Sequence, residues 1–249
     1  MSSPSVKRNI DPKTLTTLQL NPLPEISATA YILGIVSGIS IILSLPSNFS
    51  SLFDNFPFLP IYIFFISIFH FLEYFITASY QPLRVEASSF VLNNTIGYHI
   101  AHGFALIECI LELYFLPNFK KNSNYLPIKL FGLFLIILGQ SVRTLGMITA
   151  GGNFSHLIKN VKEDDHILIK HGIYSIFRHP SYFGFFWWAI GTQLLLLNPL
   201  ASILFAFMLY SFFSSRIHFE ERYLIKFFGD DYINYRHNTY IGIPFIKTK

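Results

Sequence analysis

Four long apolar segments with almost no charged side chains constrain this fold more than any other feature. They run over residues 28–45, 58–78, 94–115 and 127–147. A helix needs about 20 predominantly apolar residues to cross the hydrocarbon core of a bilayer, and each segment supplies close to that length. The mean hydropathy of +0.45 and the 13% share of charged residues are also far from the averages of soluble domains. The sequence therefore predicts an all-α polytopic membrane protein.

Two shorter apolar runs near the C-terminus predict a helical hairpin. They cover residues 182–197 and 200–213, and the turn-forming pair Asn198-Pro199 separates them. At about 1.5 Å per residue each arm spans roughly 21 to 24 Å, less than the ~30 Å hydrocarbon core, so the hairpin sits inside the bundle or thins the bilayer. We expect about six membrane segments. Because the open ends of a hairpin lie on one face, 178–182 should lie beside 216–220 and form a composite site.

The basic residues predict the orientation of the bundle. If the N-terminus is cytosolic, all but three of the 18 lysine and arginine residues fall on the cytosolic side; the exceptions are Lys120, Lys121 and Lys129. Membrane topology and anionic lipid headgroups therefore explain the net charge of +4. No basic motif or aromatic platform for nucleic acid is present. The single cysteine, Cys109, offers neither a disulfide framework nor a cysteine zinc site.

This topology divides the chain into three parts. A cytosolic N-terminal tail covers residues 1–27, and a four-span membrane bundle covers 28–147. The remaining region, 148–249, contains a cytosolic loop, the membrane hairpin 182–213 and an amphipathic helix expected at the membrane interface. The segments with the most distinctive motifs all lie in this last region.

Ionisable residues within the second and third spans face protein rather than lipid, because an ionisable group at mid-membrane costs at least ~2.5 kcal/mol unless it is paired. A metal site or proton relay is one interpretation, and hydrogen bonding between helices is the other. No His-Glu-x-x-His arrangement is present, so we favour inter-helix hydrogen bonds and predict no metal site. The residues are His70, Glu73, His99, His102, Glu108 and Glu112.

The loop and helix ends around the hairpin carry the candidate site. Pro180 fits a first helical turn with His179 in the cap position, so the backbone N–H groups that follow can receive an anion. Arg178 adds a cation, although an interfacial aromatic belt with an arginine anchor would look similar. Arg216 and Glu220 are four residues apart and share a helix face, as a plain ion pair also would.

These motifs together resemble the isoprenylcysteine carboxyl methyltransferases. The most specific block is GIYSIFRHPSYFGFFWWAIGTQ at residues 172–193. It is followed by Asn198-Pro199, Glu220-Glu221, Phe228-Gly229 and GIPFI at 242–246. The Arg-His-Pro-x-Tyr element alone is less specific, since phospholipid methyltransferases and some sterol reductases are similar there. The extended block is specific to the family.

The resemblance implies an integral endoplasmic reticulum enzyme with its catalytic loops facing the cytosol. It would use S-adenosylmethionine to methylate the C-terminal carboxylate of a farnesylated or geranylgeranylated cysteine in CaaX-processed proteins. Arg216 would contact the substrate carboxylate, and Arg216 and Glu220 would be the catalytic residues. The positions that match the family's cofactor contacts are Lys159, His166, Ile167, Leu168, Ile169, Tyr174, His179, Pro180, Ser181, Tyr182 and Glu220.

The implied chemistry suits these residues. An α-carboxyl group with a pKa near 3.5 is already an anionic nucleophile at neutral pH, so no general base is required. Catalysis then depends on positioning, which can contribute roughly 7 to 11 kcal/mol in favourable intramolecular cases. A prenyl chain would enter laterally between the spans. No Gly-x-Gly-x-x-Gly follows a strand, so the cofactor site must be built from the hairpin and its loops.

Three other functions are each compatible with part of the sequence. A phospholipid N-methyltransferase would share the cofactor geometry but would need a base for its amine and no Arg216. A membrane sterol reductase using NADPH should have a longer chain and more basic residues for the 2′-phosphate. A channel or scaffold would use the intramembrane histidines and glutamates and leave the loop motifs unexplained.

Overall fold

The computed structural model describes residues 23–45, 56–82, 84–93, 95–162 and 166–247 and is almost entirely helical in them. Most of the predicted N-terminal tail and the first residue of the predicted third span, Asn94, lie outside these ranges. The helices are α2 (Leu23–Ser44), α4 (Phe58–Tyr80), α5 (Ile96–Phe115), α6 (Pro117–Lys120), α7 (Leu126–Ala150), α8 (Pro180–Leu196), α9 (Pro199–Phe228) and α10 (Asp230–His237). Four 3₁₀ turns, Ala87–Phe90, Ser123–Tyr125, Gly151–Asn153 and Gly172–Ser175, lie in the connections.

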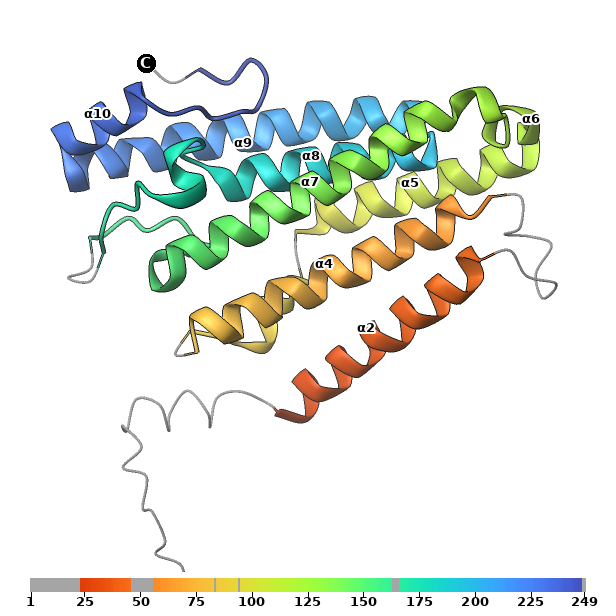
Figure 1. Ribbon diagram of the computed structural model, residues 1–249, viewed down its shortest axis with the longest axis horizontal. Helices are drawn as coiled ribbons and strands as arrows, with labels where there is room; N and C mark the ends of the chain where they lie inside the picture. The colour runs from red at the N-terminus through yellow and green to blue at the C-terminus, as the bar shows by residue number, and fades with distance from the viewer. Residues whose placement is uncertain (1–22, 46–55, 83, 94, 163–165, 248–249) are drawn as a thin grey trace, which may run out of the picture.

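The long helices run side by side, with α2 and α4 at one edge and α8 and α9 at the other (Figure 1). Five of the described helices, α2, α4, α5, α7 and α9, are long and apolar enough to cross a membrane. This confirms the predicted class. Helix α8 has 17 residues and is shorter than these five, so a count of six membrane segments stays a prediction.

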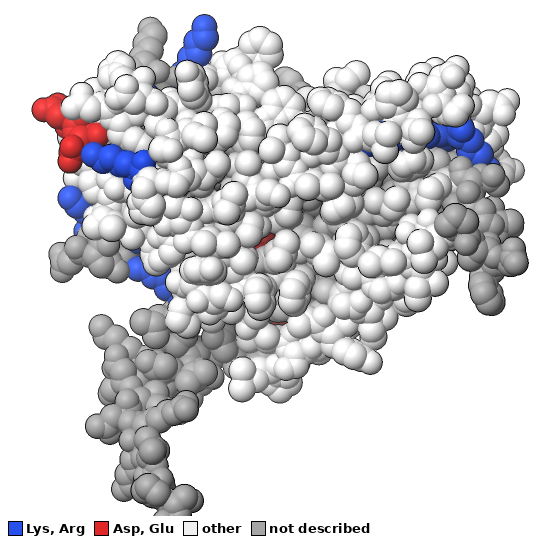
Figure 2. All heavy atoms as spheres, viewed as in Figure 1, with Lys and Arg blue, Asp and Glu red and all other residues white. Residues whose placement is uncertain are grey.

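The bundle has two ends of different character. At one end, here called the open end, lie the start of α8, the last turns of α9, helix α10 and the loop between α7 and α8 (Figure 1). At the other, here called the turn end, lie α6 and the connection from α8 to α9. On the face shown in Figure 2, lysine and arginine side chains lie at both ends, aspartate and glutamate side chains lie at the open end, and almost no charged side chain lies between the two ends. Such an uncharged band fits a hydrocarbon environment.

Glycines let α7 and α8 pack backbone against backbone. Gly132 and Gly139 are seven residues apart on α7, two helical turns, and therefore share a face. A Cβ atom on Gly139 would lie 2.5 Å from both the Gly184 carbonyl oxygen and the Trp188 nitrogen, and one on Gly132 would lie 2.5 Å from the Leu195 nitrogen. Small residues permit this close approach in membrane proteins. The α7–α8 pair is thus a rigid spine that connects the two ends.

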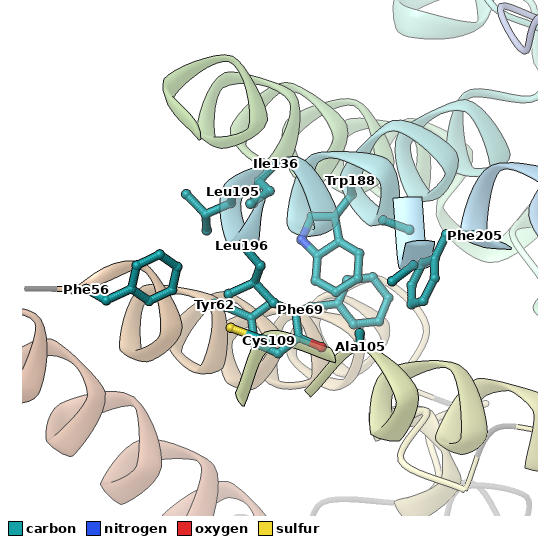
Figure 3. Packing of buried hydrophobic residues seen from close by; sticks show 12 residues of the cluster. Phe56, Tyr62, Phe69, Ala105, Cys109, Ile136, Trp188, Leu195, Leu196 and Phe205 are labelled. Carbon is teal, nitrogen blue, oxygen red and sulfur yellow. The ribbon is translucent and has the colours of Figure 1, made fainter. Parts of the chain in front are cut away.

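A cluster of buried aromatic and aliphatic side chains joins this spine to the other helices (Figure 3). The rings of Phe69 from α4 and Trp188 from α8 lie 4.5 Å apart between centroids. Ile136 from α7 and Phe205 from α9 pack into the same cluster. Because five helices contribute to one core, side chains at the open end are mounted on a common framework.

One boundary differs from the expectation. The predicted second arm ends at residue 213, with a separate interfacial helix after it, but α9 continues without interruption to Phe228. Thirty residues correspond to about 45 Å of helix. No glycine or proline lies between Pro199 and Gly229, so nothing breaks the helix. The change from apolar to polar side chains after residue 213 alters the environment of the helix but not its backbone. Gly229, with φ of 55°, ends it.

Candidate active site

A cavity of about 120 Å³ opens among the loop, the first turn of α8 and the end of α9. We call it the polar cavity. Ten of the eleven predicted cofactor-contact positions line it: His166, Ile167, Leu168, Ile169, Tyr174, His179, Pro180, Ser181, Tyr182 and Glu220. The eleventh, Lys159, lines an adjoining cavity of about 50 Å³ that shares His166 and Glu220. Residues separated by as many as 61 positions therefore surround one space.

The predicted composite site forms around the Tyr182 hydroxyl. Tyr182 donates a hydrogen bond to Glu220 Oε2 at 2.6 Å and accepts one from Arg216 Nε at 2.8 Å. The hydroxyl lies between the two charged groups, and no direct Arg216–Glu220 ion pair occurs among the described residues. The prediction that 178–182 lies beside 216–220 is confirmed, and the simple ion-pair interpretation is wrong.

Arg216 is fixed on two sides and open on a third. Besides the bond to Tyr182, its Nη2 donates to the His156 backbone carbonyl, and the guanidinium lies over the rings of Tyr182 and Phe212. Within the described part of the chain, its remaining nitrogen, Nη1, has no hydrogen-bond partner. A half-buried guanidinium held this way presents one terminal amine to an incoming anion.

Arg178, expected as a cation beside the start of α8, is used mainly for contacts within the protein. Its Nε donates to Glu221 Oε1 at 2.7 Å, and its Nη1 donates to the Thr239 carbonyl at 2.6 Å. The backbones of residues 176–178 and Tyr240 also exchange hydrogen bonds. Arg178 therefore lines the polar cavity while it ties the C-terminal segment to the start of α8. Sequence reasoning did not identify Glu221 as its partner.

His179 and the buried tyrosines complete the wall. The His179 ring stacks on Tyr182, 5.5 Å between centroids and 7° from parallel, and its Nε2 lies 3.2 Å from Glu221 Oε1. Burial, with a smaller contribution from Glu220, raises the pKa of the Tyr174 hydroxyl, so this group stays protonated at neutral pH. Tyr232 is fully buried and lines the cavity, and its hydroxyl has no hydrogen-bond partner among the described residues. Tyr232 was not among the predicted site residues.

A second cavity, of about 170 Å³, lies between α5, α8 and α9 and is mostly apolar. We call it the apolar cavity. Phe185, Leu209 and Phe212 contribute to its wall. Phe212, Arg216 and Glu220 follow at intervals of four residues and thus form one row along α9. Arg216 therefore lies between the apolar cavity, one turn before it, and the polar cavity, one turn after it.

The intramembrane carboxylates are paired between helices, as the sequence interpretation favoured. Glu73 on α4 binds Arg143 on α7 through both oxygens, at 2.5 and 2.7 Å, and His156 lies 2.9 Å from Glu73 Oε2. At the turn end, Glu108 accepts from the backbone nitrogens of Leu200 and Ala201 at the start of α9. Arg143 did not enter the sequence prediction, although a lone arginine in an apolar segment signals a buried partner.

Lys120 is the centre of the turn end. Its side chain is 0% exposed, and Nζ donates to the carbonyls of Leu196 and Leu197 and to Asn198 Oδ1 at 2.7 to 3.0 Å. The ammonium also lies 2.7 Å from Glu112 Oε2. These contacts fasten α6 to the hairpin turn.

Comparisons with known proteins agree with this geometry. Residues 132–226 match the isoprenylcysteine carboxyl methyltransferase (ICMT) family. The chain is 51% identical to a protein-S-isoprenylcysteine O-methyltransferase of Saccharomyces cerevisiae, over 92% of this chain and 94% of that protein. It is 37% identical to the human protein of the same name, over 94% of this chain and 79% of the other. A solved structure of a eukaryotic intramembrane Ras methyltransferase matches with a TM-score of 0.80 and 37% identity, over 86% of this chain and 74% of that one.

Proposed function

Because the chain belongs to the isoprenylcysteine carboxyl methyltransferase family, we propose that S-adenosylmethionine binds in its polar cavity and that Arg216 holds the carboxylate to be methylated. The protein is a membrane-embedded enzyme that methylates the C-terminal carboxylate of a prenylated cysteine to give a methyl ester. Nothing in the comparisons favours a phospholipid N-methyltransferase. The proposal concerns which groups bind where.

The row Phe212, Arg216, Glu220 on α9 is the observation that carries the proposal. A prenylcysteine has a long apolar chain next to a carboxylate, and the row presents an apolar wall next to a guanidinium in the same order. The prenyl chain, farnesyl or geranylgeranyl, would occupy the apolar cavity, entering from the lipid between the helices. Its carboxylate would then receive a hydrogen bond from the free Nη1 of Arg216.

The polar cavity suits a cationic cofactor with an aromatic base. Its wall combines the Glu220 carboxylate with the rings of Tyr174, His179 and Tyr182, which can contact a cation or an adenine. The buried Tyr232 hydroxyl lacks a protein partner and can hydrogen-bond a ligand. When bound, S-adenosylmethionine would supply an electrophilic sulfonium methyl group for transfer to the substrate carboxylate, and these residues would hold it.

The protein's own contribution is orientation. The carboxylate needs no base, so Tyr182 serves as a bridge that fixes Arg216 relative to Glu220. A single contact from Nη1 leaves the second carboxylate oxygen free to react, whereas a bidentate clamp would weaken it as a nucleophile. Lys159 lies at the adjoining cavity, where its part in cofactor binding belongs to the same proposal.

The charge distribution supports a cytosolic open end. Ten basic residues of the described chain lie at this end, namely Arg84, Lys159, Lys162, Lys170, Arg178, Arg216, Arg222, Lys226, Arg236 and Lys247, whereas the turn end carries Lys120, Lys121 and Lys129. Positive loops face the cytosol, so the cofactor would reach the polar cavity from that side. We assign the enzyme to the endoplasmic reticulum membrane, with prenylated CaaX proteins as its substrates.

The test is transfer of labelled methyl from S-adenosylmethionine to N-acetyl-S-farnesylcysteine in membranes that contain the protein. We expect base-labile ester with the wild type and a loss of at least about 100-fold with Arg216→Ala or Glu220→Ala. Arg222→Ala, an exposed arginine on the same helix, is the matched control and should retain activity. Activity retained in Arg216→Ala would sink the assignment of the carboxylate site, and label in phospholipid instead of ester would sink the assigned acceptor.

A further inference from the structure

A chain of buried and partly buried polar contacts runs beneath the site and connects its two halves. Arg143 Nη1 donates to Ser181 Oγ at 2.7 Å and to the Ser181 carbonyl at 3.2 Å, while its other nitrogens bind Glu73. Glu73 Oε2 also lies 2.9 Å from His156 Nε2. The backbone carbonyl of His156 in turn accepts from Arg216 Nη2. Glu73 on α4 thus contacts two groups. Arg143 holds the first turn of α8, and His156 holds the Arg216 guanidinium on α9 through its backbone carbonyl.

Three central members of this chain line neither the polar nor the apolar cavity. Glu73, Arg143 and His156 are absent from the described walls of the polar and apolar cavities, so they do not touch what binds there. Glu73 is 1% exposed, and both its oxygens are engaged. The guanidinium of Arg143 is further held between the rings of Phe69 and Phe185, at 5.4 and 5.5 Å. A charge fixed by so many contacts has little freedom to reorient.

The two ends of this chain of contacts lie near the two different substrates. Ser181 lines the polar cavity, where we place the methyl donor, and Arg216 lies at the boundary where we place the acceptor carboxylate. Transfer in line requires these two partners to be aligned, and a misplacement of about 1 Å can cost about 100-fold in rate. In its described residues the loop between α7 and α8 contains only short 3₁₀ turns as helical structure, so the His156 side chain is an anchor that fixes this part of the loop to the bundle.

We propose that Glu73, Arg143 and His156 are positioning residues that set the methyl donor and the acceptor carboxylate relative to one another. The inference rests on the proposed function and adds a prediction that the proposed function alone does not make. The two branches should fail separately: the His156 branch through the acceptor, and the Arg143 branch through the donor.

The experiment measures ester formation with the full-length enzyme in membranes while each substrate is varied in turn. His156→Ala leaves the Glu73–Arg143 pair intact, and its side chain is 34% exposed, so folding should tolerate the change. We expect kcat to fall by about 10- to 100-fold, the KM for N-acetyl-S-farnesylcysteine to rise, and the KM for S-adenosylmethionine to stay the same. His156→Gln, whose amide can still donate to Glu73, should recover most of the loss.

Arg143→Lys tests the other branch. A lysine keeps a positive charge next to Glu73, but it lacks the branched guanidinium group that binds Glu73 and Ser181 at the same time. We expect the KM for S-adenosylmethionine to rise with little change in the KM for the acceptor. Glu112→Gln is the matched control, because it also breaks a buried ion pair but lies at the turn end. It should lower the melting temperature and leave both KM values unchanged.

The outcomes separate the two proposals. A rise in the acceptor KM alone for His156→Ala and in the S-adenosylmethionine KM alone for Arg143→Lys, with recovery in His156→Gln, supports the positioning role. An active wild type whose variants lose activity only in step with their melting temperatures, as Glu112→Gln does, would overturn this inference and leave the proposed function standing. So would unchanged constants in His156→Ala. A wild type that forms no ester from S-adenosylmethionine would overturn the proposed function and this inference with it.

Discussion

Lys120 at the turn end and Arg216 at the open end are both basic residues connected to carboxylates, Lys120 directly to Glu112 and Arg216 through the Tyr182 hydroxyl to Glu220, yet they are used differently. The Lys120 ammonium is completely buried and is surrounded by protein oxygens from Leu196, Leu197, Asn198 and Glu112. Arg216 is only half-buried, and one of its nitrogens has no partner among the described residues. Cavities lie on both sides of Arg216 along α9: Phe212, one turn before it, lines the apolar cavity, and Glu220, one turn after it, lines the polar cavity.

The difference shows what separates a structural charge from a functional one in a membrane bundle. Both cost free energy to bury, and both must be compensated. At the turn end the protein supplies all of the compensation itself, so the charge fixes the fold. At the open end it supplies part, and on our proposal a substrate carboxylate would complete the set. Unused hydrogen-bonding capacity beside a cavity, rather than the presence of a buried charge, identifies the site.

The comparison depends on a rigid connection between the two ends, and Gly139→Ala should break it. The added methyl would lie 2.5 Å from backbone atoms of Gly184 and Trp188, which cannot move unless α7 and α8 separate. We expect the free energy of unfolding to fall by about 3 kcal/mol or more. Activity should be lost together with stability, as measured by the methyl-transfer assay and by thermal unfolding in detergent. Gly103→Ala, where nothing lies within 4 Å of the new atom, is the control and should behave like the wild type. Equal behaviour of the two variants would show that the glycine seam is not what holds the spine together.

Lys120→Met should then unfold the turn end without a specific effect on catalysis. Removing the ammonium leaves the Glu112 carboxylate and the hairpin carbonyls without their partner, which should cost about 3 to 5 kcal/mol. The melting temperature should fall, whereas the KM values of the enzyme that remains folded should not change. Lys121→Met, at the exposed neighbour, should leave the melting temperature unchanged. A selective rise in either KM for Lys120→Met would erase the distinction between the two ends.

Tyr182→Phe should produce the reverse pattern at the open end. The substitution removes only the hydroxyl that connects Arg216 to Glu220 and keeps the ring that stacks on His179. Loss of hydrogen bonds to charged groups is worth about 1.5 to 3 kcal/mol, so kcat/KM should fall by roughly 10- to 100-fold with little change in melting temperature. Tyr240→Phe, on the exposed C-terminal segment, is the control for the loss of a hydroxyl. A fall in stability as large as the fall in rate would make Tyr182 a structural residue like Lys120.

The open end was largely predictable from sequence because a hairpin constrains distant residues. A turn at Asn198-Pro199 forces the two arms together, and that alone placed Tyr182 near Arg216 and Glu220, as the structure has it. The family resemblance then selected the loop residues. Ten of its eleven cofactor positions fall around one cavity, which simple spacing along the chain could not show.

The turn end and the buried network were not predictable in the same way. Whether Glu73 faces Arg143 depends on how two helices rotate about their axes, and hydrophobic periodicity is weak in segments that are apolar on all sides. The same holds for Gly139 against Gly184. The unbroken course of α9 past residue 213 was missed because a change in polarity was taken as a helix boundary, although no residue there disfavours a helix.

The smallest effect should come from Tyr235→Phe, which removes support from the open end without removing a group of the proposed contacts. The Tyr235 hydroxyl donates to the Tyr174 backbone carbonyl at 2.7 Å, and such a bond is worth about 1 kcal/mol. Burial raises the pKa of the Tyr235 hydroxyl, so the bond contributes fully below the unfolded value of about 10 and is lost only as the pH rises through the higher folded value. The loss in melting temperature should therefore be the same at pH 6 and pH 8, within an assay range of about two units around neutrality. Activity should fall by less than about fivefold, less than in Tyr182→Phe. A loss as large as that of Tyr182→Phe would mean that Tyr235, which also lines the polar cavity, acts on the reaction as strongly as the groups proposed to contact the ligands, and that it is more than a support for Tyr174.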